Sequence, residues 1–276
     1  MSDQRGPARL VLHIGVQKTA TTAAQQFLQA NAAALKPWLT LFTPRKGTPA
    51  QQLGRKAFDY TQAPSAESEA AFVAAIRAMK AVLDQTSGTV LISHENLVGA
   101  PPGAFGETQL YPFIGRIVAL LDTHFAPYRP EFVYYSRDMA SWKRSLHNQI
   151  VKTDGYTGTW DTFQAMAAPI ADWEGFHARL CAAAGAERVT AFRLENQVSR
   201  DRPGQQLLRH LGVPDRLLAR LAPIAGLRNE SLNAGALEFM RRANAAGFSP
   251  HTLTRLGTLV AASQSLFSPS VVLTQE

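Results

Sequence analysis

Residues 13–22, HIGVQKTATT, place a lysine and three threonines between a short apolar run and an alanine-rich stretch of helical character. Backbone N–H groups at a helix start have no intrahelical partner and carry the positive end of the helix dipole, so they attract phosphate-like anions. A lysine adds a mobile charge, a glycine permits close approach of the backbone, and hydroxyls add donors. The segment therefore predicts an anion-binding turn formed by Gly15, Lys18, Thr19, Ala20, Thr21 and Thr22.

The alternative interpretation of this turn is an ordinary capped helix, with Thr19 or Thr21 as the N-cap and Lys18 solvated. The stretch is not a Walker A loop, which requires the pattern GxxxxGK[ST]. Here Gly15 precedes Lys18 by three residues, and no glycine stands directly before the lysine.

A second stretch, residues 132–152, repeats the order of apolar strand, polar residues and helix. Arg137 stands at the end of the expected strand, and Ser145 follows eight residues later, about 12 Å along a helix. The two side chains could grip one phosphate from two sides. In the alternative, Arg137 pairs with Asp138 or Glu131 and Ser145 is solvated. Two anion sites on one sheet would suit a ligand with two separated anionic groups.

Short apolar runs alternate with stretches of helical period, and this order predicts an α/β fold. We expect three layers, with a central parallel sheet of about four to five strands flanked by helices and a helical C-terminal part. The expected strands are Arg9–Gly15, Leu39–Thr43, Thr89–Ser93, Glu131–Ser136 and Arg188–Leu194. The expected helices are Thr21–Leu35, Glu67–Asp84, Thr108–Phe125, Met139–Lys152, Asp172–Ala184, Gly204–Leu211, Pro214–Leu221, Ser231–Ala246 and Pro250–Ser265. Two regions are expected to be irregular, Lys46–Pro64 and Asp154–Thr159.

The totals bound the class of protein. We expect a single domain over residues 1–276, with a helical portion from about residue 200. The net charge of +7 suits an anionic ligand. The sequence contains no run of five or six basic residues, so nucleic-acid binding is not expected. The one cysteine, Cys181, excludes an intramolecular disulfide and a Cys-based zinc site. Neither a signal peptide nor a membrane-spanning run is visible, so a cytoplasmic protein is expected.

The two anion-binding stretches together resemble the family of sulfotransferases that use PAPS (3′-phosphoadenosine 5′-phosphosulfate), in its bacterial type with a P-loop-like fold. Lys18-Thr19-Ala20-Thr21-Thr22 is similar to the 5′-phosphosulfate loop, often written KTGTT. Arg137 and Ser145 match the arginine and the serine eight residues later that form the 3′-phosphate site.

Three later stretches extend the resemblance to about residue 245. AFRLENQ, residues 191–197, is similar to the family's strand with a YEDL-like end, and LRHLGVP, residues 208–214, to the helix after that strand. RNESLN, residues 228–233, resembles the NxS stretch of bacterial members. Arg228 is a further candidate for binding the 3′-phosphate, because a basic residue in that part of related folds contacts this phosphate.

Ala20 is the departure from the family's loop, because it stands where the family has glycine. A right-handed helical φ at this position suits alanine, whereas a positive φ does not. We expect the loop to be retained.

The resemblance implies transfer of a sulfuryl group from PAPS to the hydroxyl of a saccharide or small metabolite by in-line displacement, without a metal. Lys18 would stabilise the charge on the leaving oxygen, and Arg137 and Ser145 would hold the donor. Bacterial members often have SxE at the end of the third expected strand, which matches Ser93 and Glu95. Glu95 is the first candidate for the general base and His94 the second.

Two other functions stay open. A small-molecule kinase on a P-loop-like sheet would need a magnesium site, and no strand ends in an obvious Walker B aspartate. A non-enzymatic relative could keep the nucleotide and lack turnover. The expected partner is a small-molecule or carbohydrate acceptor, whose identity the sequence does not reveal; it gives no oligomeric state either. His13, within the first strand, is expected to be a hydrogen-bonded core histidine.

Overall fold

The computed structural model describes residues 6–102, 108–224 and 231–270, and these residues form two compact units. The first unit comprises residues 6–101, 110–138 and 172–224 and contains the whole sheet. The second comprises residues 102, 108–109, 139–171 and 231–270, and its regular elements are helices. The single domain expected from the sequence stays a prediction.

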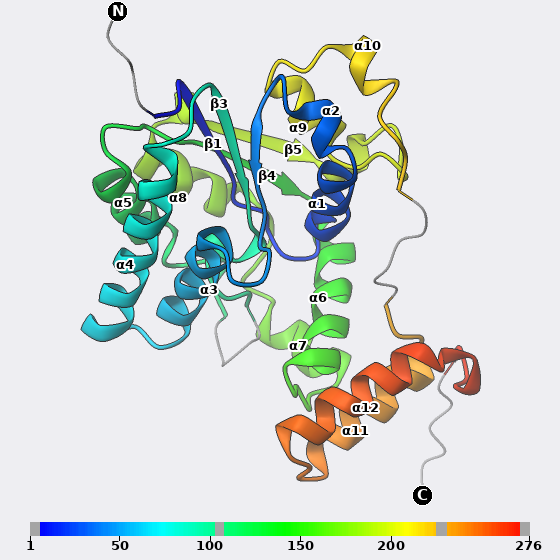
Figure 1. Cartoon of the computed structure of the whole chain (residues 1–276). Helices are drawn as coiled ribbons and strands as arrows, with labels where there is room; N and C mark the ends of the chain where they lie inside the picture. Colours follow the sequence, from blue (N-terminus) through cyan, green and yellow to red (C-terminus); the bar gives the residue numbers. More distant parts are fainter. Residues whose placement is uncertain (1–5, 103–107, 225–230, 271–276) are drawn as a thin grey trace, which may run out of the picture. The chain divides into compact units, whose positions relative to one another are not determined.

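The sheet has five strands in the order β2-β3-β1-β4-β5, and all pairings are parallel (Figure 1). The predicted α/β class with a central parallel sheet is therefore confirmed. Each strand lies within the range expected for it or coincides with that range. The strands are β1 Arg9–His13, β2 Thr40–Phe42, β3 Thr89–Ser93, β4 Glu131–Ser136 and β5 Val189–Arg193.

Helices cover both faces of the sheet, which explains why the central strands are apolar throughout. One face carries α1 Thr21–Ala30, α2 Ala32–Leu35, α9 Gln205–His210 and α10 Asp215–Leu218 (Figure 1). The other carries α3 Pro49–Gln62, α4 Ala66–Leu83, α5 Ile114–Phe125 and α8 Glu174–Ala184. Short 3-10 helices flank two of the strands: η1 Glu95–Val98 follows β3, and η3 Ala186–Arg188 and η4 Leu194–Asn196 lie on either side of β5.

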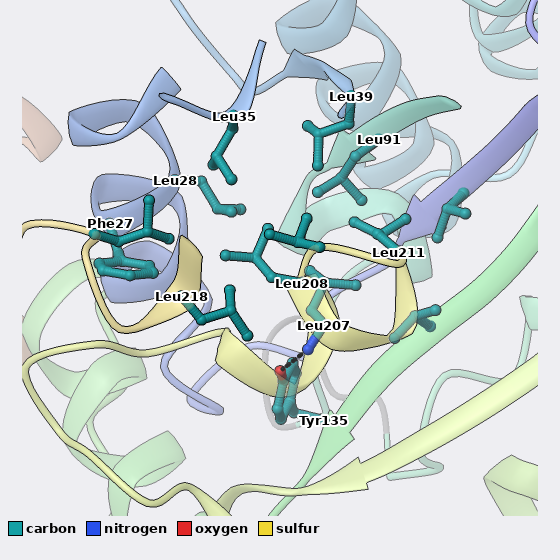
Figure 2. Packing of buried hydrophobic residues seen from close by; sticks show 14 residues of the cluster. Phe27, Leu28, Leu35, Leu39, Leu91, Tyr135, Leu207, Leu208, Leu211 and Leu218 are labelled. Atoms are coloured by element: carbon teal, nitrogen blue, oxygen red, sulfur yellow. Dashed lines mark hydrogen bonds between the residues drawn. The ribbon is translucent and has the colours of Figure 1, made fainter. Parts of the chain in front are cut away.

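The core between the sheet and α1 holds this helix in place (Figure 2). Phe27 and Leu28 of α1 pack with Leu207 and Leu208 of α9. Tyr135 of β4 joins the same cluster, and its hydroxyl accepts a hydrogen bond from the Leu207 N–H at 3.2 Å. Because this core holds α1 against the sheet, it also holds the turn that precedes α1 in place.

The prediction that Lys46–Pro64 is irregular is wrong, because α3 occupies most of this range. The Thr48 side chain caps the helix by accepting the Gln51 N–H at 3.3 Å, and Pro49 stands at the first turn. Both are standard helix-start signals. The buried residues follow a helical period that the polar composition of the stretch concealed: Ala50, Leu53, Gly54, Ala57 and Tyr60.

Two expected helices differ markedly from their predicted ranges, and others differ by one to three residues at an end. The helix expected over Thr21–Leu35 is interrupted at Asn31, whose amide donates to the backbone carbonyls of Phe27 and Ala222. These bonds end α1, and α2 begins at the next residue. The helix expected over Thr108–Phe125 starts only at Ile114.

The second unit consists of α6 Met139–Thr153, α7 Trp160–Met166, α11 Ala234–Ala245, α12 Pro250–Ala262 and the 3-10 turn η5 Gln264–Leu266. Val151 of α6 packs with Met240 of α11 and Val260 of α12. Helices α11 and α12 were predicted from the sequence, whereas α7 was not. Residues 154–159 contain no helix or strand, as expected. Within the described residues, no helix is both long and apolar enough to cross a membrane.

Candidate functional site

The carboxyl end of β1 lies at a reversal in the strand order. β1 is the central strand, and it pairs with β3 on one side and β4 on the other. The chain leaves β1 toward the β2 edge and leaves β4 toward the β5 edge. Ligands of open α/β sheets bind at such a switch point, outside the carboxyl ends of the strands. The loops after β1, β3 and β4 therefore define the candidate site.

The turn after β1 has an unusual backbone. Gly15, Lys18 and Ala20 have positive φ values of 32°, 66° and 63°. Ala20 is the N-cap of α1 in the left-handed conformation, and the right-handed helix starts at Thr21. Successive residues of opposite hand direct their N–H groups into one concavity, an arrangement that binds anions. The glycine-to-alanine departure thus falls on a position where the backbone favours glycine.

The threonines of the turn do not cap the helix, so the simple capped-helix interpretation is wrong in this respect. Ala20 is the N-cap and makes no side-chain capping bond. The Thr19 hydroxyl donates to the Val16 carbonyl at 2.6 Å, and the Thr21 hydroxyl donates to the same oxygen at 3.4 Å. These two buried threonines brace the turn, whereas Thr22 is exposed. The first turn of α1 carries no acidic side chain that would compete with an anion.

Gln17 anchors the outer part of the turn. Its amide nitrogen donates to the Gly99 carbonyl at 3.0 Å and to Asn96 Oδ1 at 3.3 Å. Its amide oxygen accepts a hydrogen bond of 2.6 Å from the hydroxyl of the buried Tyr111. The turn is therefore fastened to the segments after β3 and before α5. The sequence did not single out Gln17.

Arg137 and Lys18 lie close together. The Arg137 Nη1 donates to the backbone carbonyl of Lys18 at 3.4 Å, so the loop after β4 reaches the loop after β1. The alternative pairing of Arg137 with Glu131 is not seen, because Arg9 and His210 bind Glu131. The guanidinium of Arg137 thus lies at the carboxyl edge of the sheet, against the backbone of the turn that contains Lys18.

The backbone around Arg137 is held by two residues from later in the chain. Trp173 Nε1 donates to the Arg137 carbonyl at 2.6 Å. Glu195, just after β5, accepts the N–H of Asp138 at 2.7 Å. Glu195 belongs to the AFRLENQ stretch, whose sequence gave no reason to expect a contact with residue 138.

Neither of the other two phosphate candidates belongs to the described part of the first unit. Ser145 lies in α6, within the second unit, and is half-buried. Its pairing with Arg137 therefore stays a prediction from the eight-residue spacing. Arg228 lies outside the described residues.

Glu95 follows β3 and begins η1. Its backbone lies against the turn after β1, because a Cβ atom on Gly15 would be 3.2 Å from the Glu95 Cα. The Glu95 carboxylate accepts a hydrogen bond of 2.9 Å from the Gln25 amide of α1. The structure thus brings the first candidate base next to the turn that holds Lys18.

His94 faces a different environment. It is buried, its ring packs against Gly54 of α3, and its Nδ1 accepts the Asn96 N–H at 3.1 Å. Burial lowers its pKa, an effect opposed by the Glu95 charge and a backbone hydrogen bond with Gln51. His94 caps η1, and the nitrogen that a base would use is engaged by the backbone.

His13 is buried, as expected, but only one of its ring nitrogens has a partner among the described residues. Its Nδ1 lies 2.8 Å from the Ser93 Oγ, and its Nε2 is unpartnered. Burial lowers the pKa of His13 to about 4. The ring is therefore neutral at pH 7. An Nδ1–H tautomer leaves only an unpaired acceptor, which avoids burying an unpaired N–H donor.

Among the described residues, no group of three or more His, Cys, Asp or Glu side chains is arranged to hold a metal ion.

Ala20→Gly should stabilise the protein. A left-handed conformation costs a residue with a Cβ about 1–2 kcal/mol, and glycine avoids this cost. Part of the gain is offset because glycine gives the unfolded chain more conformational entropy. We expect the free energy of unfolding, measured in urea, to rise by about 1 kcal/mol. The matched control is Ala74→Gly in the exposed middle of α4, which should lower it by about 1 kcal/mol. Destabilisation by both changes would contradict the left-handed assignment at position 20.

Stability should fall on mild acidification. His13 has a folded pKa of about 4, below the ordinary 6.5, so the unfolded state takes up a proton first as the pH falls. The loss begins near pH 6.5, ends near pH 4, and amounts to about 2 kcal/mol between pH 7.5 and pH 5. Urea unfolding at the two pH values measures it. In His13→Gln the loss of stability due to His13 should vanish. The loss due to His94 and His147 should remain, because burial also lowers the pKa values of these two residues. An identical pH dependence in the variant would refute the assignment.

Comparison with known proteins gives one similarity of structure and none of sequence. No family model matches the chain, and no curated protein matches it. A solved structure of a sulfotransferase from Alicyclobacillus acidocaldarius is similar to the chain, with a TM-score of 0.44 and 13% identity over 91% of this chain and 95% of that one. At these values the similarity transfers no function and no residue roles, so a functional assignment has to rest on the chain's own residues.

Proposed function

We propose that the protein is a sulfotransferase that moves a sulfuryl group from PAPS to the hydroxyl of a saccharide or small metabolite. The observation that carries the proposal is the turn after β1. Left-handed Ala20 directly precedes right-handed Thr21 at the start of α1, with Lys18 in the same turn. Convergent N–H groups and a helix N-terminus favour a phosphosulfate-like anion. The motif Lys18–Thr22, with its resemblance to the phosphosulfate loop, supports this ligand.

Arg137 supports a ligand with a second anionic group. Its guanidinium reaches the backbone carbonyl of Lys18, so a cation from the loop after β4 lies beside the turn after β1. PAPS carries a 3′-phosphate in addition to its 5′-phosphosulfate. We assign Arg137 to the 3′-phosphate, because a guanidinium binds phosphate bidentately. Ser145 is the second candidate for this phosphate on the basis of its spacing, and Arg228 the third.

The proposed reaction is an in-line displacement at sulfur. The acceptor oxygen forms a bond to sulfur while the bond from sulfur to the bridging phosphate oxygen breaks. The electron pair of the broken bond stays on adenosine 3′,5′-bisphosphate, where the charge of Lys18 would stabilise it. Glu95 would take the acceptor's proton. Arg137 would bind and orient the donor but would take no part in making or breaking bonds.

Glu95 is preferred to His94 as the base on geometric grounds. His94 Nδ1 already accepts a backbone N–H and its ring packs against α3. A carboxylate has about four lone-pair sites, and the Gln25 hydrogen bond uses one of those of Glu95. Glu95 also adjoins Gly15, in the turn proposed to bind the donor.

The first test is nucleotide binding. At 100 times its Kd, adenosine 3′,5′-bisphosphate should raise the melting temperature by about 5 °C or more, and 5′-AMP should raise it less. The variant Arg137→Ala should lose most of this preference, because the guanidinium is assigned to the 3′-phosphate.

The matched control is Arg129→Ala, an exposed arginine just before the amino end of β4, which should keep the preference. Equal shifts with the two nucleotides in the unmutated protein would refute the 3′-phosphate assignment. A larger shift with ATP and Mg²⁺ than with either would favour a kinase.

The second test is turnover. Lys18→Met removes the charge that stabilises the leaving group, so release of adenosine 3′,5′-bisphosphate from PAPS should slow about 100-fold, with a smaller change in nucleotide Kd. The assay uses 4-nitrophenol, glucose and glucosamine as acceptors. Lys18→Arg keeps the charge and should retain more activity. A near-normal kcat in Lys18→Met would contradict the leaving-group role.

A further inference from the structure

Gln25 is a buried polar residue of α1 that none of the proposed roles uses. Its side chain is 6% exposed and lies among three oxygens of the segment that leads from β3 into η1. The amide nitrogen is 2.9 Å from the Glu95 Oε2, 3.2 Å from the Ser93 carbonyl and 3.4 Å from the Ser93 Oγ. Burial of an amide is stable only when its donors are satisfied, and here they are.

The acceptors fix the orientation of this amide. The Ser93 carbonyl can only accept, and an ionised Glu95 carboxylate can only accept. The Gln25 amide must therefore turn its NH₂ group, not its oxygen, toward both. With one N–H bond on the backbone of β3 and one on the carboxylate, Gln25 connects a rigid strand to the side chain of Glu95.

The same helix also carries the proposed donor site. Thr21 begins α1 and lies four residues before Gln25, so the two residues share one face of the helix. Both are buried on that face. Glu95 touches this arrangement twice, since its side chain binds Gln25 and its backbone adjoins Gly15. A carboxylate held in this way has a defined place relative to the start of α1.

We propose that Gln25 is the positioning residue for the general base: its amide orients the Glu95 carboxylate relative to the donor-binding turn. This inference rests on the proposed function, in which Glu95 accepts the proton of the acceptor. Gln25 does not act on the substrate. Its effect on the rate passes through Glu95, because misplacing a catalytic group by about 1 Å can cost 100-fold in rate.

The test compares Gln25→Met with Gln29→Met. Both replace a glutamine of α1 by an unbranched apolar side chain, but Gln29 binds Thr43 instead of Glu95. Gln25→Met should lower kcat for release of adenosine 3′,5′-bisphosphate from PAPS by about 10-fold or more, whereas its Kd for the bisphosphate stays unchanged. Gln29→Met should change neither quantity. Gln25→Glu, which keeps the size but removes the donors, should be at least as slow as Gln25→Met.

A double-mutant cycle with Glu95→Gln separates positioning from a general structural role. If Gln25 acts through the Glu95 carboxylate, Gln25→Met should cause no further loss of kcat in the Glu95→Gln background. An equal loss in both backgrounds, or a normal kcat in Gln25→Met, would overturn the positioning role and leave the proposed function intact. Failure of the unmutated protein to bind the bisphosphate and to consume PAPS with any acceptor would instead overturn the proposed function, and the role of Gln25 with it.

Discussion

The left-handed backbone of the turn between β1 and α1 is the constraint on which the candidate site depends. Two residues with side chains, Lys18 and Ala20, adopt conformations that cost each of them free energy. Such strain persists only where the surroundings determine it. Here the Val16 carbonyl accepts hydrogen bonds from two threonine hydroxyls, and Gln17 is hydrogen-bonded to the segments after β3 and before α5. The turn is therefore preorganised, as the proposed binding of an anion by its N–H groups requires.

The fold places this turn where the segments after two neighbouring strands can reach it. β1 is central, so the ends of β3 and β4 flank it directly. The loop after β4 contributes Arg137, and the segment after β3 contributes Glu95. The buried cluster beneath α1 fixes the helix against the sheet, which keeps the start of the helix in register with these ends.

The sequence predicts the strands well because each is a short β-branched or aromatic run bounded by polar residues. It predicts α3 badly, because Lys46–Pro64 is rich in glutamine, charge and proline, and this composition outweighs the helix-start signal of Thr48 and Pro49. The residues of the turn after β1 are identifiable by type and spacing, but the φ of Ala20 is not. That angle accompanies local hydrogen bonds from Thr19 and Thr21 to Val16 and long-range hydrogen bonds of Gln17. Gln25 and Glu95, 70 residues apart, show no local signal of contact apart from a polar residue on the buried face of a helix.

A chain of polar groups runs beneath the site, and its composition argues for a role beyond stability. The chain leads from His13 through Ser93 and Gln25 to Glu95. Apolar residues could fill the buried part of this space without any donors or acceptors to satisfy. Within the described residues, the His13 Nε2 has no hydrogen-bond partner. A neutral His13 ends the chain without adding charge to the interior. Only its last member, Glu95, is half-exposed, and its backbone adjoins Gly15 in the turn after β1. The polar interior thus leads to one carboxylate, which supports the proposal that Gln25 positions Glu95.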